Sequence, residues 1–246
     1  MTANASVPQT GPAPLTMRRD AWWVEPVLVV VAFGAFAIYA TWAALQGAHY
    51  EYGNYLSPFY SPLFKPSWWP FSPAILILWS PLGFRVTCYY YRKAYYRAFF
   101  WDPPACAVAE PRTGYRGETR FPFVLQNLHR YFLYTAIIVL AFLWYDALYA
   151  FIFEGRLGVG VGSLVLLANV VLLSFYTFSC HSFRHLIGGN LDCFSTCPNR
   201  YGLWRRVSLV NEHHMFWAWV SLFAVALADL YVRLLSMGLI SDVRFF

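Results

Sequence analysis

The residues best suited to chemistry gather in one short stretch, from Cys180 to Cys197, which reads CHSFRHLIGGNLDCFSTC. Three of the five cysteines and two of the six histidines fall within it, where a segment rich in Leu, Val and Phe meets a basic loop. Cysteine thiolates favour iron–sulfur chemistry, and imidazoles suit iron, copper or zinc. Any one of these side chains alone would be an ordinary residue at a helix end. The cluster predicts a metal centre.

The composition places this cluster in a membrane protein. Of the 246 residues, 59% are hydrophobic and only 12% are charged, and the mean hydropathy is +0.44. A membrane crossing takes about 20 apolar residues. Five runs qualify, namely Trp22–Leu45, Trp69–Tyr90, His129–Phe151, Val161–Phe183 and His213–Leu235. We therefore expect an all-α integral membrane protein, with a polar tail at residues 1–21 and a bundle of five transmembrane helices in residues 22–246.

The distribution of positive charge predicts the orientation of the bundle. When the loops are assigned to alternate sides, all but four of the 18 Lys and Arg residues fall on one side. The exceptions are Lys65, Arg156, Arg233 and Arg244. Basic loops stay in the cytoplasm, so we expect a cytoplasmic N-terminus. Anionic lipid headgroups would account for part of this charge. However, the long cytoplasmic loop at residues 91–128 is Pro-rich and aromatic, which indicates a surface for protein docking.

Several Cys and His side chains are expected at one depth, just inside the cytoplasmic surface. Counting about 1.5 Å per residue along each span places in this layer Cys88, His129, Cys180, His181, His185 and His214. Hydropathy does not require such sorting. The predicted metal ligands are Cys88, Cys180, His181, His185 and His214, while Cys106, Cys193, Cys197, His129 and His213 stay open as alternatives.

A polar stripe at helical spacing follows the fourth span. Its members are Ser174, Thr177, His181, His185 and Gly188. Lipid would penalise such a stripe, so we expect it to face the interior of the bundle.

Two carboxylates are expected nearer the outer side. Asp229 has Arg233 four residues on, which predicts a stabilising pair, whereas Asp146 has no partner nearby in the sequence. Structural pairing is the expected role of both, with a proton route as the alternative.

Four segments carry a family resemblance. They read CYYYRKAYYRAFFWDPPACAV, GETRFPFVLQNLHRYF, SCHSFRHLIGG and HHMFWAWVSLFAVALADLYVRL. Together they resemble the membrane-anchor subunit of actinobacterial succinate dehydrogenases, over most of the chain from the second span onward. The resemblance implies an anchor with five helices in the cell membrane. It also implies an iron–sulfur subunit and a flavoprotein subunit as partners, menaquinone or another quinone as substrate, no nucleic acid, and room for a higher oligomer.

The resemblance leaves more than one cofactor open. The better-known anchors with five helices carry two b haems, each held by histidines from facing helices. This chain has no helical histidine in its outer half, so only one inner haem b remains as the alternative. We favour a Rieske-type [2Fe–2S] cluster, in which two Cys hold one iron and two His the other. A structural zinc site comes third.

The predicted function is an electron relay from the iron–sulfur subunit, through the bound metal centre, to the quinone. Gln126, His129 and Arg130 enter the membrane together and are expected to hydrogen-bond a quinone carbonyl, with Arg184 as a comparable candidate. The alternative for these residues is a snorkelling arginine with a capping neighbour. A non-redox membrane scaffold is the competing function.

Overall fold

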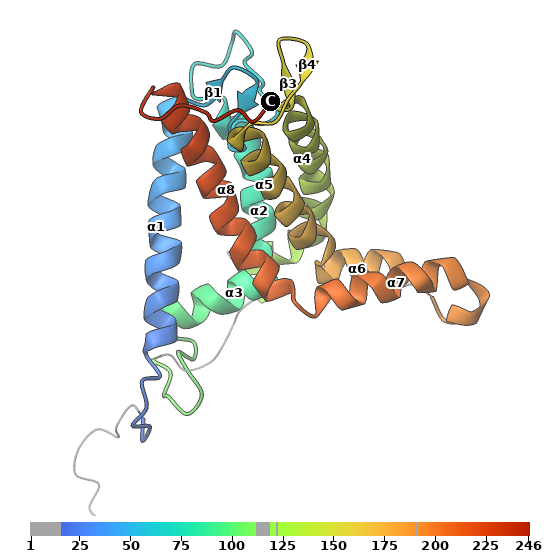
Figure 1. Cartoon of the computed structure of the whole chain (residues 1–246). Coiled ribbons are helices and arrows are strands. Elements are labelled where there is room, and N and C mark those ends of the chain that lie inside the picture. The colour runs from blue at the N-terminus through green and yellow to red at the C-terminus, as the bar shows by residue number, and fades with distance from the viewer. Residues whose placement is uncertain (1–15, 112–118, 122, 190) are drawn as a thin grey trace, which may run out of the picture.

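The computed structural model describes residues 16–111, 119–121, 123–189 and 191–246. Most of the predicted tail, and residues 112–118 and 122 of the predicted docking loop, lie outside the described residues. Five apolar helices pack side by side in a bundle (Figure 1). They are α1 (Val24–Gln46), α2 (Ala74–Thr87), α4 (His129–Tyr149), α5 (Val161–Phe178) and α8 (His214–Ser236).

Four segments of the described chain are long and apolar enough to cross a membrane. They are α1, α5, α8, and α4 together with the turn before it, Val124–Tyr149. Helix α2 is apolar but has 14 residues, which is about 21 Å at 1.5 Å per residue. The prediction of a helical membrane protein is therefore confirmed. Four of the five predicted spans are long enough to cross a membrane, and the fifth, α2, is shorter.

The second and fourth apolar runs each break at a cysteine. Helix α2 ends at Thr87 and α5 ends at Phe178, and the backbone is extended at Cys88 (ψ 131°) and at Cys180 (ψ 139°). A new helix begins directly after each cysteine, α3 (Tyr89–Tyr95) and α6 (His181–Gly188). The prediction of one continuous fourth span to Phe183 is therefore wrong.

Local hydrogen bonds give a reason for these breaks. The hydroxyl of Thr87 donates to the carbonyl of Gly83 at 2.6 Å, and the hydroxyl of Ser179 donates to that of Tyr176 at 3.1 Å. A side chain that bonds back to the preceding turn competes with the helical ladder. Because of the break at Cys180, the polar stripe from Ser174 to Gly188 does not lie on one face of one helix. Hydropathy alone does not locate such a break, because polar residues such as Ser174 and Thr177 already lie on the helix before it and Phe183 lies after it.

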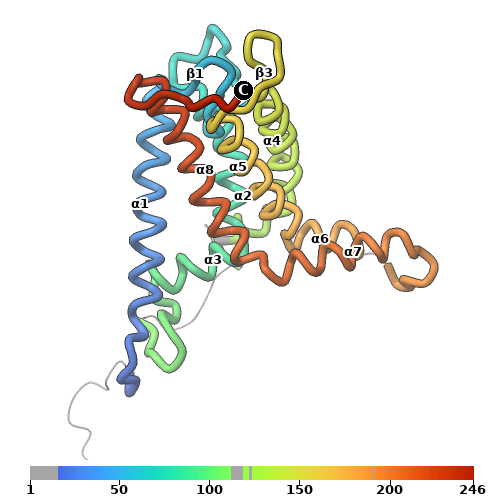
Figure 2. Tube along the Cα trace, in the orientation of Figure 1, coloured from blue at the N-terminus to red at the C-terminus, as the bar shows by residue number. Residues whose placement is uncertain are grey.

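The short helices cross one end of the bundle, which we call the inner end. There α3 runs toward α1, while α6 and α7 (Pro198–Asn211) form an arm that projects sideways (Figure 2). The short 3₁₀ turn η4 (Phe194–Thr196) lies at the arm's tip. A Cβ atom on Gly188 would come within 2.3 Å of the Trp204 ring, so the two helices pack closely at this glycine. Arg184 lies over the same ring, 4.6 Å from its centroid.

The predicted docking loop at 91–128 is partly helical. It contains the end of α3, a π-helical turn η1 (Tyr96–Phe100) and a 3₁₀ turn η3 (Phe123–Leu128).

The opposite, outer end of the bundle carries two small antiparallel hairpins. One pairs β1 (Glu51–Tyr52) with β2 (Tyr55–Leu56), and the other pairs β3 (Ile152–Phe153) with β4 (Arg156–Leu157). The C-terminus also lies at this outer end (Figure 1).

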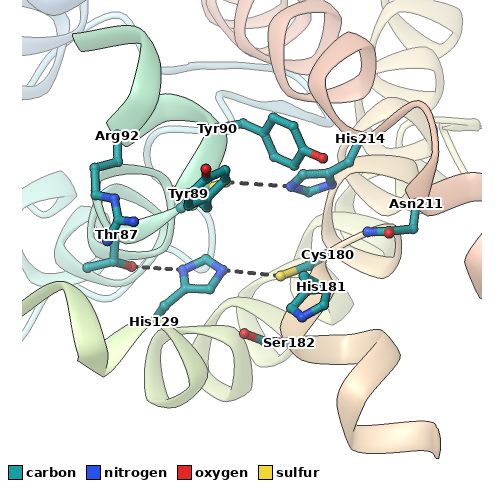
Figure 3. Close-up of a pocket in the computed structure, with 11 residues that line it drawn as sticks. Thr87, Tyr89, Tyr90, Arg92, His129, Cys180, His181, Ser182, Asn211 and His214 are labelled. Atoms are coloured by element: carbon teal, nitrogen blue, oxygen red, sulfur yellow. Dashed lines mark hydrogen bonds between the residues drawn. The ribbon is translucent and has the colours of Figure 1, made fainter. Parts of the chain in front are cut away.

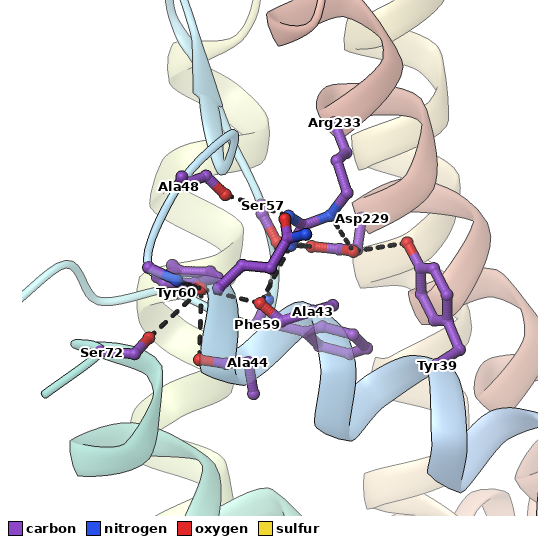
Figure 4. A network of polar contacts seen from close by, with 12 residues as sticks. Tyr39, Ala43, Ala44, Ala48, Ser57, Phe59, Tyr60, Ser72, Asp229 and Arg233 are labelled. Carbon is purple, nitrogen blue, oxygen red and sulfur yellow. Dashed lines mark hydrogen bonds and ion pairs between the residues drawn. The ribbon is translucent and has the colours of Figure 1, made fainter.

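A buried ion pair joins the outer parts of α1 and α8 to the outer loop. Asp229 and Arg233 are 0% and 1% exposed, with Nε and Oδ2 3.2 Å apart, which confirms the predicted pair. Tyr39 and Ser57 also donate to the carboxylate, and Arg233 donates to the carbonyl of Ala43 near the end of α1 (Figure 4). Such full pairing offsets much of the cost of removing two charges from water.

Asp146, which has no partner nearby in the sequence, finds one in the fold. The hydroxyl of Ser61 donates to its carboxylate. The two residues are 85 positions apart, so only the tertiary structure brings them together. Both outer carboxylates therefore take part in structural contacts.

Candidate functional site

A cavity of about 440 Å³ lies at the inner end of the bundle. Its wall includes two cysteines and three histidines, Cys88, His129, Cys180, His181 and His214. They come from both helix breaks, from the first residue of α6 and from the first residues of α4 and α8, as Figure 3 shows for those that it labels. Elements far apart in the sequence thus bring the metal-seeking side chains into one place.

Two thiol–imidazole contacts form the centre of this cavity. The Nε2 atom of His129 lies 3.1 Å from the sulfur of Cys180, and the Nε2 atom of His214 lies 3.5 Å from the sulfur of Cys88. The partners are separated by 51 and 126 positions in the chain. Each of the two pairs therefore depends on the packing of different helices.

The second nitrogen of each imidazole is held by a hydroxyl group. Nδ1 of His129 lies 2.9 Å from the Thr87 hydroxyl oxygen, and Nδ1 of His214 lies 2.6 Å from that of Ser179. Each hydroxyl already donates its single hydrogen to a backbone carbonyl. While it does so, it can only accept a hydrogen bond from the imidazole. In this arrangement the proton of each ring is on Nδ1 and the lone pair of Nε2 faces a sulfur atom.

The two halves of the site repeat one local pattern. The bundle helices α2 and α5 end at or just before a hydroxyl residue followed by a cysteine, Thr87-Cys88 and Ser179-Cys180. Three residues and an arginine follow each cysteine. The backbone N–H groups of Arg92 and Arg184 donate to the carbonyls of the two cysteines and start the new helices. Thr87, next to Cys88, holds His129, which contacts Cys180. Ser179, next to Cys180, holds His214, which contacts Cys88. We call the two thiol–imidazole pairs crossed for this reason.

The two cysteines of the site are buried, and its two imidazole rings are held by aromatic neighbours. Cys88 and Cys180 are each 2% exposed, and both belong to a hydrophobic cluster with residues such as Leu133 and Leu222. The His129 ring stacks on Phe84 with centroids 4.8 Å apart, and the His214 ring stacks on Tyr176 at 5.2 Å. Aromatic packing and the hydroxyl contacts together fix the direction of both imidazoles. This pre-organisation is what a metal ligand requires.

Two thiols and two imidazole lone pairs are the donor set of several iron and zinc centres. As the side chains stand, no three His, Cys, Asp or Glu groups among the described residues converge on a position for a single metal ion. The arrangement is two separate pairs of donors. It can bind soft or borderline metals, or an entity large enough to reach both pairs.

The structure places the predicted ligands differently from one another. Cys88, Cys180 and His214 form the contacts described above, and His181 lines the same cavity. His185 does not line it. Its Nδ1 atom lies 2.6 Å from the guanidinium of Arg130, on the exposed side of α6. The fourth member of the two pairs is instead His129, which the sequence assigned first to quinone binding and only second to a metal.

The other predicted quinone residues lie outside the cavity. The amide of Gln126 bonds to the hydroxyls of Tyr95 and Tyr96. Arg130 contacts His185, and Arg184 donates to Ser208 at 2.8 Å. These side chains hold the short inner helices in place.

Sequence reasoning missed the residues that orient the imidazoles, Thr87 and Ser179. The repeated hydroxyl–cysteine pattern followed by an arginine at the fourth position was a signal for them. Tyr89, Tyr90, Ser182 and Asn211 also line the cavity. They were missed because the helix breaks that aim them at the cavity are not visible in hydropathy.

Comparisons with known proteins decide the family. The family model described as actinobacterial succinate dehydrogenase subunit SdhC matches residues 24–238, which includes every helix of the bundle. The chain belongs to this family. The match also covers all four side chains of the two thiol–imidazole pairs.

A solved structure is similar over the whole length of this SdhC-family chain. A chain of the Mycobacterium smegmatis Sdh1 complex in the apo form is 44% identical, with a TM-score of 0.88 and full coverage of both chains. Among proteins with curated functional descriptions, none matches the chain. Family membership makes the protein a subunit of a succinate dehydrogenase, and its apolar helices make it a membrane subunit. The predicted resemblance is confirmed.

Proposed function

We propose that this SdhC-family chain is the anchor at which a succinate dehydrogenase passes electrons to a membrane quinone. Within it, Cys88, Cys180, His129 and His214 hold a Rieske-type [2Fe–2S] cluster. The observation that carries the proposal is the pair of crossed thiol–imidazole contacts, each with its Nδ1 atom already held by a hydroxyl group.

The donor set fits a two-iron cluster better than the other two cofactors. A haem held by two histidines needs their Nε2 atoms to face each other across a flat slot, and here each Nε2 faces a cysteine sulfur instead. A zinc ion needs about four donors around one point, whereas these donors lie in two pairs. A Rieske-type [2Fe–2S] cluster needs two Cys for one iron and two His for the other, and this cavity brings together Cys88 and Cys180 with His129 and His214.

When bound, such a cluster supplies a one-electron carrier whose potential is raised by its imidazole ligands. The chain's own residues prepare the place for it. Thr87 and Ser179 hold the protons on Nδ1, and the apolar cluster around Cys88 and Cys180 keeps water away. The backbone breaks at the two cysteines direct their side chains into the same cavity, which the continuous helices would not do.

The same cavity is the proposed place for the quinone headgroup, menaquinone or another quinone. A quinone carbonyl accepts hydrogen bonds, and Tyr89, Tyr90, His181 and Ser182 bring donor groups to the cavity wall. This assignment replaces Gln126, Arg130 and Arg184, whose polar groups bond elsewhere.

The orientation is proposed from charge and from the path of the chain. Helix α2 leads from the outer hairpin β1–β2 to α3 at the inner end (Figure 1), so we propose five crossings in all. The basic inner end then faces the cytoplasm, with the N-terminus inside and the C-terminus outside. An impermeant maleimide applied to intact cells should reach cysteines introduced at the exposed positions Glu51 and Ser241. Labelling of Cys193 on the arm from outside would overturn the orientation.

The iron–sulfur subunit, which carries the flavoprotein subunit, is proposed to dock on the inner end. Arg205 and Arg206 are exposed on the α6–α7 arm and suit an acidic surface. The double variant Arg205→Glu/Arg206→Glu should weaken assembly of the complex, more at low salt than at high salt, because salt screens exposed charges. Arg156→Glu, on the outer hairpin, serves as the control. Equal assembly of both variants at every salt concentration would place the docking surface elsewhere.

The metal and the function are tested together on the purified complex. Its dithionite-reduced EPR spectrum should contain a Rieske-type signal that is lost in His129→Ala/His214→Ala. That variant should still oxidise succinate with a soluble artificial acceptor and should lose quinone reduction. His185→Ala, which removes an imidazole outside the cavity, should keep both activities. A b-type optical band instead of the EPR signal would show a haem. Silence in both spectra, with full quinone reduction in the double variant, would favour a scaffold.

A further inference from the structure

A positive charge lies inside the bundle, beside the two thiol–imidazole pairs. Arg85 is on α2, three residues before Cys88. Its guanidinium donates to the Tyr91 hydroxyl, to the carbonyl of Ala218 at 3.3 Å and to the Ser221 hydroxyl at 3.1 Å. These partners are all neutral. Among the described residues, no carboxylate forms an ion pair with Arg85; the ion pairs there are Arg18–Asp20 and Arg233–Asp229.

An unneutralised cation in a membrane segment is costly, and its usual justification is function. The outer half of this bundle shows the alternative, because Arg233 there is fully paired with Asp229. Two aromatic rings hold Arg85 instead. Its guanidinium carbon lies 4.7 Å from the centroid of Tyr176 and 5.5 Å from that of Tyr91. Such cation–π contacts favour the charged form without removing its charge.

The hydroxyl of Tyr176 is a second unusual feature of the same place. It is buried and makes no fully formed hydrogen bond to a described residue, although it is placed to bond weakly to the Cys88 thiol. A buried hydroxyl without a full hydrogen bond is costly, so it calls for an explanation. The Tyr176 ring stacks on His214. The sulfurs of Cys88 and Cys180 are both near enough to its hydroxyl to interact with it electrostatically.

Arg85 also acts on Cys88 and His214. Its charge is within electrostatic range of both the Cys88 sulfur and the His214 imidazole. Cys88 and His214 are almost fully buried, whereas Arg85 is half-buried, so water screens this interaction only in part. One thiol–imidazole pair, Cys88 with His214, therefore has a cation and a hydroxyl donor beside it.

We propose that Arg85 and Tyr176 are positioning residues that raise the reduction potential of a centre held by Cys88, Cys180, His129 and His214. This inference rests on the proposed function. One electron added to such a centre lowers its net charge by one unit, with no bond formed or broken. The electron comes from the iron–sulfur subunit, and a quinone takes two electrons and two protons to become the quinol. A nearby cation and a hydrogen bond to a ligand sulfur both stabilise the more negative, reduced state.

The test is a potentiometric titration of the EPR signal in the intact purified complex. Tyr176→Phe removes one oxygen atom and keeps the ring that packs on His214 and Arg85. Arg85→Met removes the charge, and Arg85→Lys keeps the charge but loses the planar fork. Tyr145→Phe, at an exposed position of α4, is the control. We expect the midpoint potential to fall in Tyr176→Phe and in Arg85→Met, and to return toward the wild-type value in Arg85→Lys.

The outcomes separate the inference from the proposed function. If the wild-type complex has no EPR signal that depends on His129 and His214, the proposed function fails and the inference fails with it. If the signal is present and its midpoint is the same in wild type, Tyr176→Phe and Arg85→Met, only the inference is overturned. A purely structural role predicts loss of signal intensity at an unchanged midpoint. Should Arg85→Met not assemble, Tyr176→Phe decides the question alone, and an unchanged midpoint in that variant overturns the inference.

Discussion

The hydroxyl oxygen of Thr87 lies 2.9 Å from Nδ1 of His129, and the other nitrogen of the same ring lies 3.1 Å from the sulfur of Cys180. Thr87 is next in sequence to Cys88, the cysteine that His129 does not contact. Ser179, next to Cys180, does the same for His214 and Cys88. The two breaks in the bundle are thus linked through histidines on two other helices, and a change at one break is felt at both pairs.

Loss of the hydroxyl at position 87 should loosen the proposed metal centre without unfolding the bundle. Thr87→Val keeps the shape of the side chain but cannot form the hydrogen bond with Nδ1 of His129. Second-shell changes of this kind cost about 10–100-fold in metal affinity. We expect less iron per complex and a weaker EPR signal after dialysis against a chelator, with Thr87→Ser close to wild type. Equal iron retention in all three proteins would show that the hydroxyl has no such role.

The thiol of Cys193 on the arm should react at lower pH than an ordinary exposed cysteine. Its side chain lies 2.9 Å from the Ser195 hydroxyl, and hydrogen bonds from Ser195 lower the pKa of this thiol. The thiolate is the reactive form, so the maleimide labelling rate should reach its plateau at a lower pH. Ser195→Ala should move the profile to higher pH. The measurement uses a background in which Cys106 and Cys197 are serine, and coincident profiles would contradict the prediction.

Breaking the outer ion pair should destabilise the protein more than replacing both partners. Asp229→Asn leaves a buried guanidinium without its counter-charge, for which a loss of about 3–5 kcal/mol is typical. Arg233→Met leaves the carboxylate unpaired with a similar effect. The double variant should be more stable than the sum of the single losses predicts, because no unpaired charge remains. Thermal unfolding of the detergent-solubilised complex would measure this coupling, and strict additivity would argue against it.

Close packing of α2 against α4 should depend on Gly83. A Cβ atom there would come within 2.2 Å of the Phe132 ring, whereas one on Gly34 of α1 meets no atom within 4 Å. Overpacking costs about 1–3 kcal/mol. Gly83→Ala should therefore lower the unfolding temperature, and Gly34→Ala should leave it unchanged or raise it slightly, since alanine favours helix more than glycine. Similar shifts for both variants would mean that Phe132 moves aside at little cost.

The predictable part of the site was its depth. Counting residues from the ends of the apolar runs predicts one layer for Cys88, Cys180 and His214, and the fold brings them to one cavity. The same count includes His185 only if the fourth span is one continuous helix. The helix instead ends before Cys180, which turns α6 out of the bundle and carries His185 to the exposed side.

The sequence by itself determined the helical membrane architecture, the paired Asp229 and Arg233, and the family, because each depends on composition or on neighbours within a few turns. Only the tertiary structure decided which histidine faces which cysteine. Those contacts join residues 51 and 126 positions apart, and they depend on the exact direction of each side chain. That direction follows from the backbone breaks at Cys88 and Cys180 and from the hydroxyls beside them. The breaks and the placement of the hydroxyls depend on specific hydrogen bonds. The hydrophobic effect is non-directional, so an apolar pattern in the sequence does not predict them.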